Sequence, residues 1–171
     1  MTDDVLANNP HIRVADLEAL HAGAWQWCYS LAGNEADDVL QQVYVMLIEG
    51  KARFRGESTL KTWLYAVIRR AALKDRRRRK RWLGLEEAQL DTAAIELSDT
   101  VAITPYLSKL PAKQREVLEL SIYREFTLAE CAHIMGVRLG TARTHYHRGK
   151  AALRALLTQQ QQDKRLPDEV D

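Results

Sequence analysis

The sequence predicts an all-α protein of two small helical domains joined by an acidic linker, the second containing a helix-turn-helix. Three observations support this fold class. Apolar residues recur at helical spacing along most of the 171 residues, whereas strand patterns are nearly absent. Residues 61–81 hold ten basic side chains and one acidic one, whereas residues 82–100 hold five acidic and no basic ones. A short helix, a glycine turn and a second helix follow nearer the C-terminus.

The first predicted domain covers residues 1–82 and begins with two helices. A helix from about Val14 to Leu31 ends at Gly33, and a second helix begins after Asn34, whose side chain can cap it. The second helix buries four apolar residues at spacings typical of one helix face: Val39, Leu40, Val43 and Leu47. A loop from Gly50 to Ser58 separates this pair from the third helix.

The third helix begins near Ser58 or Thr59 and ends in a concentrated basic run. Its apolar residues follow helical spacing: Leu60, Trp63, Leu64, Val67 and Ile68. The run from Arg76 to Arg81 consists entirely of cations, which repel one another in isolation. A polyanion lying alongside the helix makes such a run tolerable, so the run predicts a polyanionic partner.

Residues 83–104 are predicted to be a linker, because the helical periodicity stops there and every charged residue is Asp or Glu. The second domain covers residues 105–158, and a polar tail covers residues 159–171. Pro111 is expected in the first turn of a helix that buries Val117, Leu118 and Ile122.

A capping box is predicted where Thr127 precedes Glu130 by three residues, because each side chain can bond the other residue's backbone amide. The helix that begins there turns Ala129, Ala132 and Ile134 inward. It stops at Gly136, which can adopt the left-handed conformation that ends a helix. These signals place a short helix before the turn of a helix-turn-helix.

The second helix of this motif is predicted from Leu139 to Leu157, after a turn at Val137 and Arg138. One face carries the apolar or small residues Ala142, Tyr146, Gly149 and Leu153. The remaining positions are rich in hydrogen-bond donors: Thr141, Arg143, Thr144, His147 and Arg148. Arg can pair with guanine through two hydrogen bonds and Thr can contact thymine, so this face is expected to read the major groove. An ordinary solvated helix face is the alternative.

Other function classes are disfavoured by the residue content. Cys28 and Cys131 lie far apart in apolar helical patterns, which predicts two buried, reduced thiols and no disulfide framework. We expect no metal site and no cofactor, because His133, His145 and His147 lack a carboxylate or Cys to complete a ligand set. We also expect that the protein is not an enzyme, because its sequence lacks the phosphate-binding, zinc-protease and nucleophile-elbow motifs. No segment approaches the roughly 20 apolar residues of a membrane span, so a cytoplasmic protein without membrane insertion is predicted.

The ordered combination of these features resembles the extracytoplasmic-function (ECF) group of bacterial RNA polymerase sigma factors over about residues 14–157. In the first domain, residues 36–42 (ADDVLQQ) resemble the family's core-binding helix, residues 54–58 (FRGES) its short loop, and residues 62–65 (TWLY) the start of its promoter-melting helix. In the second domain, residues 110–117 (LPAKQREV) and 140–144 (GTART) resemble its reader of the upstream promoter element.

The resemblance implies a transcription initiation factor that binds core RNA polymerase, directs it to promoter DNA and is controlled by an anti-sigma factor. It assigns core binding to Asp37, Asp38, Gln41 and Gln42. It assigns the downstream promoter element to Phe54, Arg55, Lys61, Trp63, Arg69, Arg70, Lys74, Arg76 and Arg77. It assigns the upstream element to Arg138, Thr141, Arg143, Thr144, His147 and Arg148.

Alternatives remain at several of these positions. The polar patch on the second helix also fits a solvated face, and the spacing of Trp63 favours a core position over a base-stacking one. The cations of the third helix are better candidates for DNA contacts, because burying them is costly. For the whole chain, the alternative is a helix-turn-helix regulator that acts without core polymerase. A membrane-surface protein is disfavoured, because the basic run lacks an adjoining apolar face.

Overall fold

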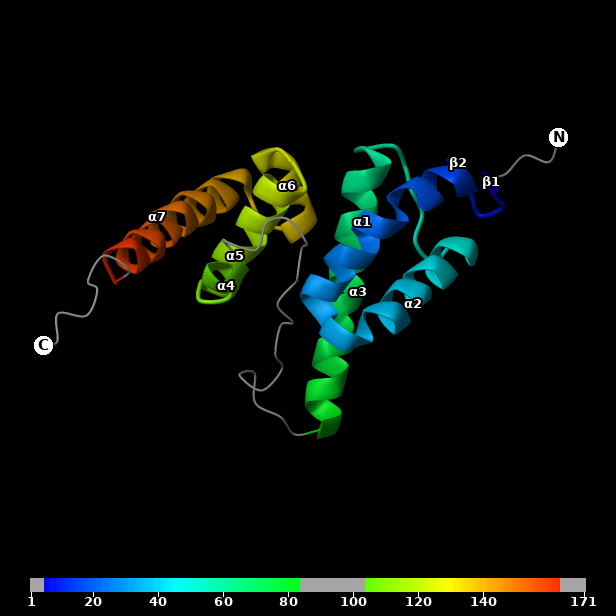
Figure 1. The fold of residues 1–171 in the computed structure, drawn as a ribbon. Coiled ribbons are helices and arrows are strands. Elements are labelled where there is room, and N and C mark those ends of the chain that lie inside the picture. The colour runs from blue at the N-terminus through cyan, green and yellow to red at the C-terminus, as the bar shows by residue number, and fades with distance from the viewer. Residues whose placement is uncertain (1–4, 84–103, 164–171) are drawn as a thin grey trace, which may run out of the picture. The chain divides into compact units, whose positions relative to one another are not determined.

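The computed structural model describes residues 5–83 and 104–163, which form two compact helical units (Figure 1). The first contains β1 (Val5–Leu6), β2 (Asn9–Arg13), α1 (Val14–Ala32), η1 (Gly33–Glu35), α2 (Ala36–Ile48) and α3 (Leu60–Leu83). The second contains α4 (Thr104–Leu107), α5 (Ala112–Leu118), η3 (Glu119–Tyr123), α6 (Leu128–Met135) and α7 (Leu139–Asp163). The all-α fold class is confirmed, and most of the predicted linker lies outside the described residues.

In the first unit, α1, α2 and α3 pack against one another around an apolar core. The four predicted α2 residues are buried, and from the other two helices Trp27, Leu64 and Ile68 join them. The Trp27 indole N–H donates to the Tyr65 carbonyl at 3.1 Å, which ties α1 to α3. Gly33 ends α1 with a φ of 61°, as predicted. Asn34 does not cap α2, because η1 fills the gap between the helices and Glu35 occupies the cap position without a side-chain bond.

A two-stranded antiparallel sheet precedes α1. This sheet was not predicted from the sequence. β1 and β2 pair Val5 with Arg13 and Leu6 with Asn9. Two side chains of β2, Asn9 and Ile12, are buried. The strands are too short to show a repeating alternation, so pattern alone did not detect them.

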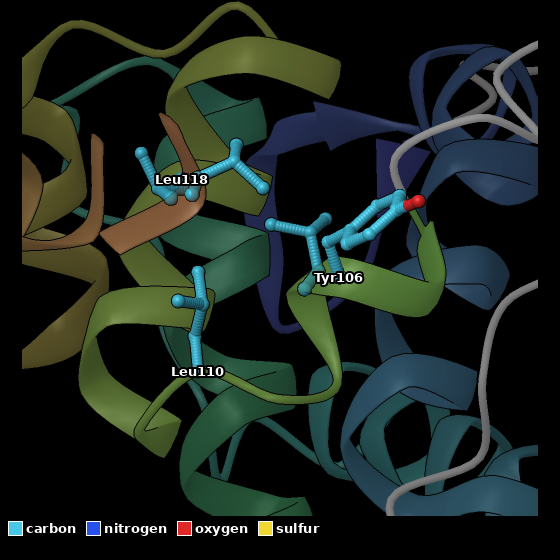
Figure 2. Packing of buried hydrophobic residues seen from close by; sticks show 5 residues of the cluster. Tyr106, Leu110 and Leu118 are labelled. Atoms are coloured by element: carbon cyan, nitrogen blue, oxygen red, sulfur yellow. The ribbon is translucent and has the colours of Figure 1, made fainter. Parts of the chain in front are cut away.

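The second unit is built on an apolar cluster shared by α4, α5 and α7. Its buried members are Tyr106, Leu107, Leu110, Leu118 and Leu153 (Figure 2). Pro111 lies at the N-cap of α5, one residue before the predicted first turn, and its carbonyl accepts from the amides of Gln114 and Arg115. α7 extends to Asp163, beyond the predicted end at Leu157 and into the predicted tail.

Two residues predicted to be buried are exposed. Ile122 lies in η3, a π-helical turn with a wider repeat than an α-helix, so the α-helical spacing from Leu118 does not hold there. Ala129 is exposed in the first turn of α6, whereas Ala132 and Ile134 are buried as predicted. Both cysteines are buried and reduced, as the sequence predicted.

Candidate nucleic-acid interface

A groove of about 550 Å³ lies in the first unit between α2, the loop that follows it and α3. It is lined by Gln42, Met46, Lys51, Ala52, Arg53, Trp63, Val67, Arg70, Ala71, Lys74, Asp75, Arg78 and Arg81. Cations dominate its polar lining, and Trp63 and Val67 supply apolar surface. Single-stranded nucleic acid binds to this combination, because cations attract the backbone and flat side chains stack on bases.

Phe54 and Trp63 form an aromatic pair beside this groove. Their ring centroids are 5.4 Å apart with planes tilted by 52°. Both side chains are half-buried, and Trp63 lines the groove. The core assignment of Trp63 is therefore wrong: the side chain packs on Phe54 and keeps part of its surface open.

A second, shallower groove of about 810 Å³ runs along α3. Its lining residues are Arg70, Leu73, Lys74, Arg77, Lys80 and Arg81, which recur at intervals of three and four and so share one helix face. Arg70, Lys74 and Arg81 line both grooves. The structure thus brings three predicted DNA contacts, Arg70, Lys74 and Arg77, to one exposed cationic surface.

Several predicted downstream contacts lie elsewhere. Arg69 was expected to be exposed, because burying a cation is costly, but its side chain is buried and only 7% exposed. Lys61 and Arg76 are half-buried, line neither groove and each have interaction partners. Arg55 is exposed on the loop outside both linings. Whether a cation of α3 is exposed depends on the helix face on which it lies, and not on the number of basic residues around it.

Part of the basic run is held by ion pairs within the unit. Asp75, whose side chain is 11% exposed, lies 2.8 Å from Arg78 and 2.9 Å from Arg79. Arg79 also lies 3.1 Å from Glu35, so it connects α3 to η1. Arg79 is therefore a structural residue, in contrast to the exposed Arg77.

The loop between α2 and α3 contributes two cations that sequence reasoning missed, Lys51 and Arg53. Isolated basic residues in a loop carry no periodic signal, so only the folded path of the loop places them opposite α3. The start of α3 is fixed by Thr59, whose hydroxyl accepts from the Thr62 amide at 3.1 Å, as the predicted helix start requires.

The exposed face of α2 carries the residues that the resemblance assigned to core binding. Asp37, Asp38, Gln41 and Gln42 are all exposed. They do not form a single patch, because Gln42 lines the groove and Asp37 accepts a hydrogen bond from the Trp25 indole at 2.7 Å. Asp38 and Gln41 instead continue along the helix to Val45 and Ile48, which are 45% and 57% exposed.

The second unit presents a donor-rich face on α7. The residues predicted for the upstream element are all exposed: Thr141, Arg143, Thr144, His147 and Arg148 lie on α7, and Arg138 lies in the turn before it. On the opposite side Ala142, Gly149 and Leu153 are buried and Tyr146 is half-buried, as predicted. The Thr144 hydroxyl donates to the Gly140 carbonyl at 2.9 Å, which leaves its methyl group and oxygen lone pairs for a base. Lys150, which the prediction omitted, lies over the Tyr146 ring at 5.3 Å.

Local sequence signals set the start of this helix-turn-helix. The Thr127 amide donates to the Glu130 carboxylate at 2.9 Å, and the Glu130 amide donates to the Thr127 hydroxyl at 3.3 Å. Gly136 has a φ of 64°, and the Val137 amide donates to the Ala132 carbonyl at 3.0 Å. The capping box and the left-handed glycine are confirmed.

Among residues 5–83 and 104–163, no helix is both long and apolar enough to cross a bilayer.

Comparison with known proteins connects both units to one family. Residues 17–82 match the family model of sigma-70 region 2, and residues 101–153 match that of sigma-70 region 4. The chain is 30% identical over 156 residues to the ECF RNA polymerase sigma factor SigW of Bacillus subtilis, covering 78% of this chain and 82% of SigW. It is 29% identical over 168 residues to the ECF sigma factor EcfG of Rhodopseudomonas palustris, covering 92% of this chain and 84% of EcfG.

A solved structure shares the fold. The sigma factor RpoE, in complex with the anti-sigma factor NepR from Bartonella quintana, matches with a TM-score of 0.69 at 22% identity. The match covers 84% of this chain and 95% of RpoE.

Proposed function

The chain belongs to the ECF sigma factors of bacterial RNA polymerase, and we propose that three exposed surfaces divide the work of such a factor. It is a transcription initiation factor that binds core RNA polymerase and directs it to specific promoters. We infer that it acts in the cytoplasm and that it contributes no catalytic residue of its own.

The face of α2 that carries Asp38 and Gln41 is proposed to bind the core enzyme. The exposed Val45 and Ile48 extend this face, so the contact combines polar groups with apolar area. Apolar area supplies burial energy in protein interfaces, and charged groups at the rim select the partner. Asp37 is proposed to act less directly, because its carboxylate holds Trp25.

The grooves beside α3 are proposed to hold the downstream promoter element as its strands separate. Arg70, Lys74 and Arg77 supply positive charge along the backbone path. Trp63, supported by Phe54, supplies a flat surface on which an unpaired base can stack.

The donor-rich face of α7 is proposed to read the upstream element in the major groove of duplex DNA. Arg143, His147 and Arg148 are exposed and carry nitrogen donors for base edges or phosphates. The capping box and the turn at Gly136 give the two-helix geometry that such readers share.

The observation that carries this proposal is the contrast between α2 and α3, which pack on each other and expose opposite chemistry. α2 exposes carboxylates and amides, whereas α3 exposes a line of cations, and the Phe54–Trp63 pair lies beside the groove that some of these cations line. A protein partner and a nucleic-acid partner can therefore bind the same unit on different faces.

Reconstitution with core enzyme tests the proposal. A random-sequence duplex library transcribed by core polymerase plus this protein would yield its promoter, and permanganate would then report unpaired thymines on that promoter. We expect reactive thymines in the downstream element with holoenzyme, but not with the protein alone or core alone. Equal reactivity without core would contradict the proposal, and sequence-specific duplex binding with no co-elution with core would favour a helix-turn-helix regulator.

We also propose that an anti-sigma factor binds this chain. One matched structure is a sigma factor bound to such a protein, RpoE with NepR, and another shows CnrH in complex with the cytosolic domain of CnrY. Co-purification of this chain from its own cells, followed by mass spectrometry, tests for a bound inhibitor that core polymerase displaces.

A further inference from the structure

The N-terminal strand β2 is anchored to the loop between α2 and α3 by one buried amide. Asn9 is 2% exposed. Its Nδ2 donates to the Leu47 carbonyl at 2.7 Å and to the Ala52 carbonyl at 3.0 Å. Its Oδ1 accepts from the Phe54 amide at 2.9 Å. A single side chain thus joins the end of α2 to both sides of Arg53.

The same region satisfies all four carbonyls in the last turn of α2. The Val45 and Met46 carbonyls accept from the amides of Glu49 and Ala52. The Leu47 carbonyl accepts from Asn9 and from the Gly50 amide, and the Ile48 carbonyl accepts from Asn8 Nδ2 at 2.7 Å. Helix ends need such partners, so the two asparagines and the loop close α2 together.

Only an asparagine meets the three requirements at position 9. The two carbonyls need an N–H donor, and the Phe54 amide needs an acceptor, so the side chain must provide both. A carboxylate at this position would face two carbonyl oxygens with no donor. A glutamine has the same groups on a longer arm, which does not fit the same buried volume without displacement.

The loop that Asn9 holds forms one wall of the groove. Lys51, Ala52 and Arg53 line the groove, and Phe54 packs on Trp63. Gly50 adds a second constraint, because its φ is 70° and a Cβ there would lie 2.8 Å from the Asn8 Cβ. The loop therefore follows a path set by contacts with β2 and the residue before it, and not by α2 and α3 alone.

We propose that Asn9 is a positioning residue for promoter opening, which holds Arg53 and Phe54 where they complete the groove opposite α3. The inference rests on the proposed function of that groove. Asn9 lies outside residues 17–82, the segment that matches the family model of region 2. Its effect reaches DNA through the loop and involves no contact between Asn9 and the DNA.

The test compares Asn9→Ala and Asn9→Asp with the matched control Asn8→Ala in reconstituted holoenzyme. Asn8 is the neighbouring asparagine and also bonds a carbonyl at the end of α2, but it has no hydrogen bond to the loop segment 52–54. On a promoter that wild-type holoenzyme opens, we expect both Asn9 variants to slow opening by about tenfold, the loss expected when one stacking contact is misplaced. We expect Asn8→Ala to stay within about twofold of wild type, because Asn8 is exposed and water can replace its bond to the Ile48 carbonyl.

Two further measurements separate positioning from a loss of folding. Core affinity of the Asn9 variants should equal that of wild type, because the exposed face of α2 is unchanged. Hydrogen exchange should show the Phe54 amide unprotected in Asn9→Ala, which removes its acceptor, and protected in Asn8→Ala. Opening at the wild-type rate, or an equal loss of core binding and opening, would overturn the inference.

A second variant covers the case in which the Asn9 variants do not fold. Gly50→Ala displaces the loop by contact with Asn8 and leaves the Asn9 side chain in place. It should slow opening to a similar degree with unchanged core affinity, and normal opening would overturn the inference. If wild-type holoenzyme itself opens no promoter, the function proposed for the groove fails, and that result is distinct from a wild-type-like Asn9 variant.

Discussion

Gly149 of α7 lies directly against Leu118 of α5. A Cβ at Gly149 would lie 3.0 Å from Leu118 Cδ1 and 3.2 Å from its Cγ, closer than ordinary packing allows. A glycine inside a helix costs about 1 kcal/mol relative to alanine. In α7 the glycine allows the helix to approach α5 closely. The donor-rich face lies on the opposite side of α7 and is exposed.

Gly149→Ala should therefore destabilise the second unit although alanine is the better helix former. We expect a loss of about 1–2 kcal/mol in the free energy of unfolding, because the added methyl overpacks the contact with Leu118. Gly140→Ala is the matched control in the same helix, since a Cβ there meets nothing within 4 Å. It should stabilise by about 0.5–1 kcal/mol. Urea unfolding followed by circular dichroism measures both, and equal stabilisation by the two variants would contradict the packing argument.

Both thiols should be inert in the folded protein. Burial, together with the charges of Asp37 and Asp75, raises the pKa of Cys28 to about 12. Burial, followed by the charge of Glu130, raises the pKa of Cys131 to about 12. A raised pKa keeps each thiol protonated at pH 8, and the shift from 9.0 lowers its thiolate fraction by roughly a thousandfold.

Ellman's reagent at pH 8 checks this directly. Two thiols should react within the mixing time in denaturant, and neither should react at a comparable rate in the native protein. Rapid reaction of one native thiol would show that its helix opens locally or that its pKa is not raised.

The capping box predicts which substitutions of Thr127 preserve the stability of the second unit. Thr127→Ala removes the acceptor for the Glu130 amide and should cost about 1 kcal/mol of stability. Thr127→Ser keeps the hydroxyl and should lie close to wild type. The free energies of unfolding of the two variants provide the comparison, and similar losses in both would assign the effect to the threonine methyl group.

Features repeated along a helix could be predicted from the sequence. Val39, Val43 and Leu47 are buried because helical spacing fixes one face, and Gly136 ends α6 because glycine adopts a positive φ without strain. Ile122 was placed wrongly because the α-helical repeat stops at η3. The sheet and its buried Asn9 escaped prediction because the two strands are short and the bonds of Asn9 join positions about 40 residues apart.

The candidate site could be predicted only where it lies on helices. The exposed face of α7 followed from the four positions opposite it, so Arg143 and Arg148 were located correctly. In the basic run, composition alone did not distinguish the exposed Arg77 from the paired Arg79 or the buried Arg69. Loop residues such as Arg53 gave no signal, because their position depends on hydrogen bonds to a distant strand.

Core binding through α2 predicts that charge reversal on its exposed face abolishes the complex. Asp38→Arg combined with Gln41→Arg should eliminate co-elution with core polymerase, while the helical circular-dichroism signal stays at the wild-type level. Asp37 is left unchanged, because its bond to Trp25 gives it a structural role. A control pair, Glu18→Arg with Gln159→Arg, makes the same charge change at exposed positions elsewhere and should co-elute normally. Co-elution of the α2 double variant would remove this assignment.

The two cationic surfaces should differ in what they contribute to promoter binding. Contacts to phosphates position a protein on DNA, whereas contacts to base edges select the sequence. Arg148→Ala on α7 should relax preference at one or two base pairs of the upstream element, costing about 1–3 kcal/mol there. Arg77→Ala on α3 should weaken all promoters alike and reduce the salt slope of binding by about one.

Arg79→Ala is the matched control for Arg77, because it removes an arginine from the same run whose guanidinium pairs with Asp75 and Glu35. Its loss should lower the melting temperature and leave the salt slope of holoenzyme binding unchanged, since a charge already paired inside the protein releases no counterions from DNA. Binding titrations at several salt concentrations, on promoters altered one base pair at a time, separate the three variants. A change of base preference in Arg77→Ala with none in Arg148→Ala would reverse the assignment of the two surfaces, and a reduced salt slope in Arg79→Ala would show that its ion pairs open when DNA binds.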